Sequence, residues 1–199
     1  MRYSYGSSEN TPIWVLIGIN IIVFILGYII ADLNYNLALQ LSSFSLRPWT
    51  IVTAMFVHDG FFHIFLNMLT LFFFGTFLIQ MVGTGRFLIV YIVGGIVGNL
   101  LFLLFAYLGI AADMYTFLVG SSGAIFALGG TLVVLVPKVR VYLYGLVPVP
   151  LWVAIILGFL IVFLPFFSGV AWQAHLGGLI TGLAAGLYFR SENLRYRIR

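Results

Sequence analysis

The chain has 199 residues, of which 63% are apolar, 7% are charged and none is cysteine, and its net charge is +4. Soluble domains carry roughly 25% charged residues, so this composition excludes a soluble protein. The absence of cysteine also excludes a disulfide scaffold, thiolate metal sites and a cysteine nucleophile. The remaining class is an integral membrane protein.

Six apolar stretches follow one another, and each is long enough to cross a hydrocarbon core of about 30 Å as a helix. None contains Asp, Glu, Lys or Arg. A backbone inside a bilayer must satisfy its own hydrogen bonds, and these runs lack the alternation of strands. We predict an all-α membrane protein, a six-transmembrane-helix bundle forming one domain over residues 1–199. The predicted spans are 13–31, 61–82, 87–110, 115–136, 149–167 and 171–189.

The first outer loop, residues 32–60, is long and carries many apolar side chains. A loop exposed to water rarely presents so much apolar surface. We therefore expect it to be membrane-associated, with Trp49 at the depth of the lipid headgroups.

The basic residues predict the orientation of the bundle. If the N-terminus is cytoplasmic, six spans return the C-terminus to the cytoplasm. Arg47 is then outside, and the other eight of the nine Lys and Arg residues are inside, as the positive-inside rule requires. We expect an integral protein of the plasma (inner) membrane with both termini cytoplasmic. Its cations lie at the ends of spans, which predicts contact with the lipid bilayer and no nucleic-acid partner.

Four polar side chains interrupt the spans at one depth. His63 and Asn67 lie in the second span, Ser122 in the fourth and His175 in the sixth. All three spans enter from the outer face, and each residue lies within about two turns of that end. His63 and Asn67 are four residues apart and share a helix face. Polar residues are costly inside a membrane, so this shared layer indicates a functional site opening to the extracytoplasmic side.

Small residues predict how the fourth and sixth spans pack. In the sixth span they recur every four positions, at Ala174, Gly178, Gly182 and Gly186. The fourth span carries a matching set, Gly120, Gly123, Ala127 and Gly130. Such stripes let two helices approach closely, and packing along them would bring Ser122 within hydrogen-bond reach of His175. A serine beside a neutral imidazole is the minimum arrangement for nucleophilic acyl transfer.

Each of these residues also has a structural reading when it is taken alone. A serine in a glycine-rich helix often serves packing, an intramembrane histidine often makes a structural hydrogen bond, and an asparagine often joins two helices. Trp49 is interpreted as an interface anchor, and Asp59 as a solvated or capping acid. The functional reading depends on the three helices together.

Three short motifs occur in chain order. They are His58 through His63 to Asn67, then Gly120-Ser121-Ser122-Gly123, then Ala174-His175-Leu176-Gly177-Gly178 continuing to Gly182. Together they resemble the rhomboid family of intramembrane serine proteases, and the resemblance covers essentially the whole six-span core.

The resemblance implies an intramembrane serine endopeptidase with a Ser–His dyad. Ser122 would be the nucleophile, and His175 its general base and acid. His63, Asn67 and the Ser122 backbone N–H would form the oxyanion hole. The residues implied to line the substrate site or cavity are Gly120, Ser121, Phe126 and His58.

The resemblance also implies the partners. Substrates would be single-span membrane proteins, cleaved near the extracytoplasmic membrane boundary, and the fifth span with Phe166, Phe167 and Trp172 would gate their access. No metal or cofactor is implied, and the oligomeric state stays open. Because no Asp or Glu lies in any span, no buried carboxylate can orient His175, and Phe126 is the candidate to stack on its ring.

The chain departs from the family pattern at three positions. Phe126 stands where tyrosine is common, Thr50 follows Trp49 where arginine is common, and Ile79 occupies the position of a common acid. The last two changes concern the anchoring of the first loop.

Two rival functions stay open. One is a non-proteolytic rhomboid-like protein that binds client helices, although retention of Ser122 and His175 argues against it. The other is a small transporter or channel, which the lack of a charged pathway and of inverted repeats disfavours.

Overall fold

The computed structural model describes residues 10–110, 112–143, 147–160 and 171–197, and most of these residues are helical. The long helices are α1 (Thr11–Ile29), α4 (Phe61–Val82), α5 (Thr84–Tyr107), α6 (Ser122–Leu135), α7 (Leu151–Leu160) and α8 (Trp172–Arg197). Short helices form the first loop, namely α2 (Leu33–Leu37), η1 (Leu41–Ser43), α3 (Thr50–Thr53) and η2 (Ala54–Phe56). The two strands are β1 (Arg140–Leu143) and β2 (Val147–Pro150).

Three helices are long and apolar enough to cross a membrane. They are α1, α4 and α5, with mean hydropathies of 2.3, 1.9 and 2.5, whereas α6 and α7 are apolar but shorter. Many large apolar side chains on these helices are exposed, among them Trp14, Phe62 and Ile89. A surface of this kind suits lipid rather than water, so the chain is an integral membrane protein. The count of six spans stays a prediction.

The prediction for the second span agrees with α4, but the start of the fourth span was wrong. The helix α6 begins at Ser122 and not at residue 115. The apolar residues before it are not helical, because Leu118 forms an isolated antiparallel bridge with Leu39 of the first loop. Leu118 is buried, whereas Tyr115 and Phe117 are exposed. A pattern of apolar residues cannot distinguish such a segment from a helix.

Other boundaries also differ from the prediction. The predicted fifth span started at 149, within β2, whereas α7 begins at Leu151; residues 161–167, including Phe166 and Phe167, lie outside the described residues. The hairpin formed by β1 and β2 was missed, so the all-α prediction was wrong in this connection. The two strands are antiparallel, with Arg140 opposite Pro150.

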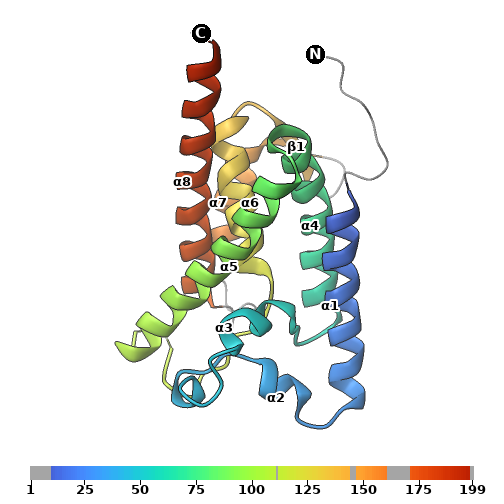
Figure 1. Cartoon of the computed structure of the whole chain (residues 1–199), viewed down its shortest axis with the longest axis vertical. Coiled ribbons are helices and arrows are strands. Elements are labelled where there is room, and N and C mark those ends of the chain that lie inside the picture. Colours follow the sequence, from blue (N-terminus) through green and yellow to red (C-terminus); the bar gives the residue numbers. More distant parts are fainter. Residues whose placement is uncertain (1–9, 111, 144–146, 161–170, 198–199) are drawn as a thin grey trace.

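The centre of the bundle is the contact of α8 with α5 and α6, which is visible in Figure 1. Glycines let these helices touch backbone to backbone. A Cβ at Gly178 would collide with the carbonyl oxygen of Gly123, and a Cβ at Gly182 with that of Ala127. The small-residue stripes therefore determine how closely the start of α8 approaches the start of α6.

The first loop folds over the end of the bundle that lies away from the C-terminus of α8 (Figure 1). Backbone hydrogen bonds tie it to the segment before α6, because Leu118 N donates to Leu39 O at 2.8 Å and Gly120 N donates to Ala54 O at 2.9 Å. Asn99 of α5 also donates to the carbonyl of Ile51 at 2.8 Å. The loop therefore helps to fix the backbone that leads into Ser122.

Arg47 anchors the loop internally. Its buried guanidinium donates to the Tyr35 carbonyl and to Ser43 Oγ, and it lies 4.0 Å from the centre of the Tyr35 ring. The Thr50 hydroxyl donates to the Arg47 carbonyl at 2.6 Å, which joins Arg47 to the start of α3.

Candidate active site

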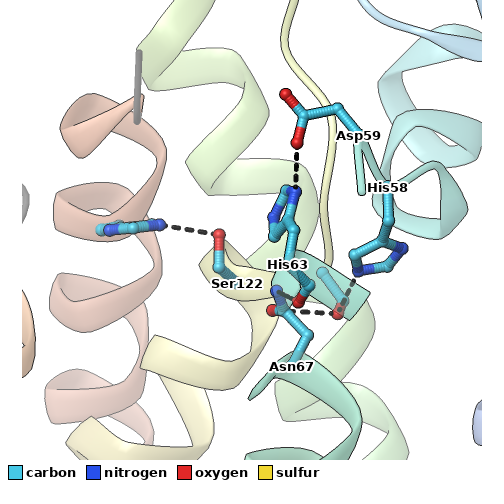
Figure 2. A network of polar contacts seen from close by, with 7 residues as sticks. His58, Asp59, His63, Asn67 and Ser122 are labelled. Atoms are coloured by element: carbon cyan, nitrogen blue, oxygen red, sulfur yellow. Dashed lines mark hydrogen bonds and ion pairs between the residues drawn. The ribbon is translucent and has the colours of Figure 1, made fainter. Parts of the chain in front are cut away.

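Ser122 and His175 meet where α6 and α8 begin. His175 Nε2 lies 2.7 Å from Ser122 Oγ. A dashed line in Figure 2 marks this contact, and Ser122 is labelled there. Ser122 is the first residue of α6, and His175 lies in the first turn of α8. Gly123 favours the close approach, because a Cβ there would make a tight contact of 3.1 Å with the Ala174 carbonyl oxygen. The arrangement places a hydroxyl within proton-transfer distance of an imidazole.

The His175 ring is oriented by stacking. Its centroid lies 4.5 Å from that of Phe126, with 23° between the planes. The other ring nitrogen, Nδ1, is buried and has no hydrogen-bond partner among the described residues. The neighbouring Trp172, at the start of α8, packs edge-on against Phe105. Apolar packing therefore takes the place that a carboxylate has in a serine triad.

Replacing Phe126 by leucine tests this role. If Ser122 and His175 act as a catalytic pair, kcat should fall about three- to tenfold, because an aromatic pair contributes roughly 0.5–1.5 kcal/mol beyond its burial. KM should change little, and Phe126→Tyr, which keeps the ring, should retain activity. Steady-state kinetics of the two variants provide the measurement. Equal activity of Phe126→Leu and the unmodified chain would show that stacking does not orient the imidazole.

His63 and Asn67 face the same site from α4 (Figure 2). A Cβ built on Gly120 would lie 2.7 Å from His63 Nε2, so this nitrogen packs directly against the backbone before Ser122. Gly120 has φ +114°, a conformation that glycine alone adopts readily. Asn67 Nδ2 donates to the His63 carbonyl at 2.8 Å, which uses one of its two amide hydrogens.

Ser121 and His58 form a second, buried serine–histidine contact. Ser121 Oγ lies 3.5 Å from His58 Nε2 and donates its hydrogen to Asn67 Oδ1 at 3.3 Å. Ser121 is 0% exposed, whereas Ser122 is partly exposed. A hydroxyl that is buried and already donates to an amide is poorly placed to attack a substrate. The contact instead fixes the orientation of the Asn67 amide.

Burial lowers the pKa of His58 from its ordinary value of 6.5 to about 3, and the nearby His63 contributes to the same direction. The unfolded chain binds a proton below pH 6.5 that the folded chain excludes. The free energy of unfolding therefore falls as the pH is lowered from 6.5 toward 3, by about 1.4 kcal/mol per pH unit for this group.

The variant His58→Gln keeps a hydrogen-bonding side chain and removes this titration. We expect its midpoint of thermal unfolding in detergent to fall less than that of the unmodified chain between pH 6.5 and about pH 5. Differential scanning fluorimetry at several pH values measures the difference. Parallel acid curves for the two proteins would show that His58 does not cause the loss.

Asp59 makes a contact that the sequence reasoning did not predict. It is solvated, as interpreted, with its side chain 81% exposed, but its Oδ1 lies 3.1 Å from His63 Nδ1. The four-residue spacing between Asp59 and His63 was the available signal, but Asp59 precedes α4 and so does not belong to the helix face that the spacing describes.

No group of three or more potential metal ligands occurs among the described residues.

The family model described as Rhomboid domain matches residues 45–192, which is most of the chain and includes every residue of the site. The chain belongs to the rhomboid family. The relatives of this rhomboid include Rhomboid protein 1, mitochondrial, of Saccharomyces cerevisiae, which is 30% identical over 213 residues, covering 98% of this chain and 58% of the relative.

Two further relatives are named as proteases. Rhomboid-like protease 3 of Toxoplasma gondii is 29% identical over 206 residues, covering 94% of this rhomboid and 72% of the relative. Rhomboid protease GluP of Bacillus subtilis is 31% identical over 141 residues, covering 69% of this rhomboid and 25% of the relative. This rhomboid therefore spans 58% of the yeast relative and a quarter of GluP.

Proposed function

We propose that this rhomboid is an intramembrane serine endopeptidase that uses Ser122 and His175 as a catalytic dyad. The observation that carries the proposal is the 2.7 Å contact between Ser122 Oγ and His175 Nε2. Support comes from the relatives whose names include protease and from apolar helices of membrane-spanning length around the site.

The reaction would proceed by acyl transfer. As Ser122 Oγ bonds to the carbonyl carbon of the substrate, its proton passes to His175 Nε2. Collapse of the tetrahedral intermediate breaks the peptide bond, and the leaving nitrogen takes the proton from His175. A water molecule then gives a proton to the imidazole and attacks the acyl carbon. The second tetrahedral intermediate breaks the ester bond to Ser122 Oγ, which takes the proton back from His175. Stacking of Phe126 would hold the ring in place through both proton transfers.

The oxyanion that forms in both steps requires hydrogen-bond donors, and three groups from two helices would supply them. His63 Nε2 and the second Asn67 amide hydrogen would approach from α4. The Ser122 N–H belongs to the first turn of α6, where backbone amides have no intrahelical acceptor and the helix dipole favours negative charge. Removing one donor from such a hole typically costs about 10²–10³ in rate.

We further propose six spans, cytoplasmic termini and a site that opens to the extracytoplasmic side. The hairpin and the C-terminal end of α8 lie at the end of the bundle away from the first loop (Figure 1). Lys138 and Arg140 belong to that hairpin region, and Arg86 pairs there with Glu192 at 2.8 Å. This clustering of cations agrees with the positive-inside rule, and Ser122 lies toward the opposite end. A plasma (inner) membrane location and a membrane-embedded first loop belong to the same proposal.

The test is cleavage of a single-span model substrate in proteoliposomes. We expect the purified chain to cut this substrate near its extracytoplasmic boundary, with the cleaved bond mapped by mass spectrometry. Substrate that is captured but stays whole would overturn the proposal and favour the non-proteolytic binding protein. Cleavage near the opposite boundary would overturn the proposed orientation.

A further inference from the structure

We propose that Asp59 is a positioning residue that fixes the Nδ1 proton of His63 and makes this histidine a cationic oxyanion donor. The inference rests on the proposed function and deepens it. It concerns a carboxylate outside the spans, so it is separate from the absence of an acid beside His175.

The contact has a definite geometry. Asp59 Oδ1 lies 3.1 Å from His63 Nδ1, and the dashed line in Figure 2 joins these two residues. The carboxylate side chain is 81% exposed and the imidazole 29% exposed. Gly60, with φ +141°, lies between Asp59 and the start of α4 and turns the chain so that the acid reaches back over the first turn.

The contact determines which nitrogen carries a proton. An ionised carboxylate only accepts hydrogen bonds, so Nδ1 is the donor to Asp59. The opposite nitrogen, Nε2, faces Gly120. A Cβ built on Gly120 would lie 2.7 Å from this nitrogen and 3.8 Å from Ser122 Oγ. With one proton on the ring, Nε2 would present a lone pair to the site. With two protons, it presents an N–H.

An oxyanion accepts hydrogen bonds and repels a lone pair, so the reactive ring must carry both protons. Asp59 then serves as the counterion of the imidazolium. During attack a second positive charge forms nearby, because His175, which contacts Ser122 from α8, takes up the hydroxyl proton. Like charges repel, so the His63 imidazolium requires a counterion, and Asp59 supplies it while Ser122 attacks the substrate.

The other charged groups of the described residues have different partners or lie at other places. Asp32 precedes α2, Asp113 closes a turn with Thr116, and Glu192 pairs with Arg86. The helices α1 and α6 contain no charged residue, and the one in α5, Arg86, lies in its first turn. Asp59 is thus the one described carboxylate positioned to act on His63.

The variant Asp59→Asn removes the charge and keeps an oxygen acceptor. We expect kcat to fall about fivefold, as for loss of an exposed ion pair, with KM within twofold. The alkaline limb of the pH–rate profile of Asp59→Asn should lie at lower pH than that of the unmodified chain. Added salt screens exposed ion pairs, so it should slow the unmodified enzyme more than Asp59→Asn. Asp59→Glu should restore most of kcat, and the matched control Asp32→Asn should behave like the unmodified chain.

Nitrogen-15 NMR of the histidines gives a readout independent of turnover. The chain has three histidines, so comparison with His63→Gln assigns the His63 signals. At the pH of the activity assay we expect a His63 ring protonated at both nitrogens, and we expect Asp59→Asn to lower the fraction of this doubly protonated form. An unchanged His63 spectrum, or unmodified kcat and pH profile in Asp59→Asn, would overturn the inference. So would a loss of kcat that Asp59→Glu does not restore. None of these results affects the proposed function, which fails only if the unmodified chain does not cleave or if Ser122→Ala does.

Discussion

Ser122→Ala and His175→Ala are each expected to lower the rate of substrate cleavage by roughly 10⁴-fold or more, because either change removes the proton transfer that activates the nucleophile. The double variant should be no slower than the single ones, since the two residues act as a unit. Cleavage of a single-span substrate in proteoliposomes, followed by gel electrophoresis over several decades of enzyme concentration, measures the effect.

The control for this prediction is Ser191→Ala, which removes an exposed hydroxyl near the other end of α8. It should cleave at the unmodified rate. The assignment of Ser122 as the nucleophile would be contradicted if Ser122→Ala cleaved the substrate at a substantial rate while Ser121→Ala did not cleave it. That pattern would transfer the nucleophilic role to Ser121 and its 3.5 Å contact with His58.

Gly120→Ala is expected to lower kcat by about 10²–10³-fold, the cost of one oxyanion donor. The added Cβ would lie 2.7 Å from His63 Nε2 and 3.0 Å from Cε1, so the end of the His63 ring must shift away from its position beside Gly120. The backbone at φ +114° also disfavours any side chain. Cleavage kinetics measure the first effect, and the midpoint of thermal unfolding measures the second.

Gly83→Ala separates the two causes. Gly83 also has a positive φ, +83°, but a Cβ there meets no atom within 4 Å. It should lower thermal stability and leave kcat close to that of the unmodified chain. If Gly120→Ala cleaved as fast as Gly83→Ala, His63 would not act through the position that it occupies beside Gly120.

The sequence predicted which polar side chains lie close together better than it predicted the shape of the fold around them. His63, Asn67, Ser122 and His175 were grouped because polar side chains are costly in a bilayer and these four share one depth. The structure brings them around one point, since small residues let α8 touch α6. Their catalytic roles stay proposals. The stripes could be read from sequence because glycine that recurs every four residues in a membrane helix marks a face against which another helix packs.

The remaining features depend on contacts distant in sequence, which a local pattern does not contain. Residues 115–121 are not helical because they pair with the first loop, through the bridge of Leu118 to Leu39 and the hydrogen bond from Gly120 N to Ala54 O. The hairpin between α6 and α7 was hidden by the apolar residues that continue into α7. Asp59 lies just outside a span. The search for carboxylates near the histidines was confined to the spans, so it did not connect Asp59 to His63.

The most direct test of the account is labelling with a fluorophosphonate, which reacts with an activated serine hydroxyl. Peptide mapping by mass spectrometry should find one phosphonate adduct on Ser122 in the unmodified chain, none in His175→Ala and none in Ser122→Ala. An adduct on Ser121, or equal labelling of Ser122 without His175, would contradict activation of Ser122 by the imidazole that contacts it.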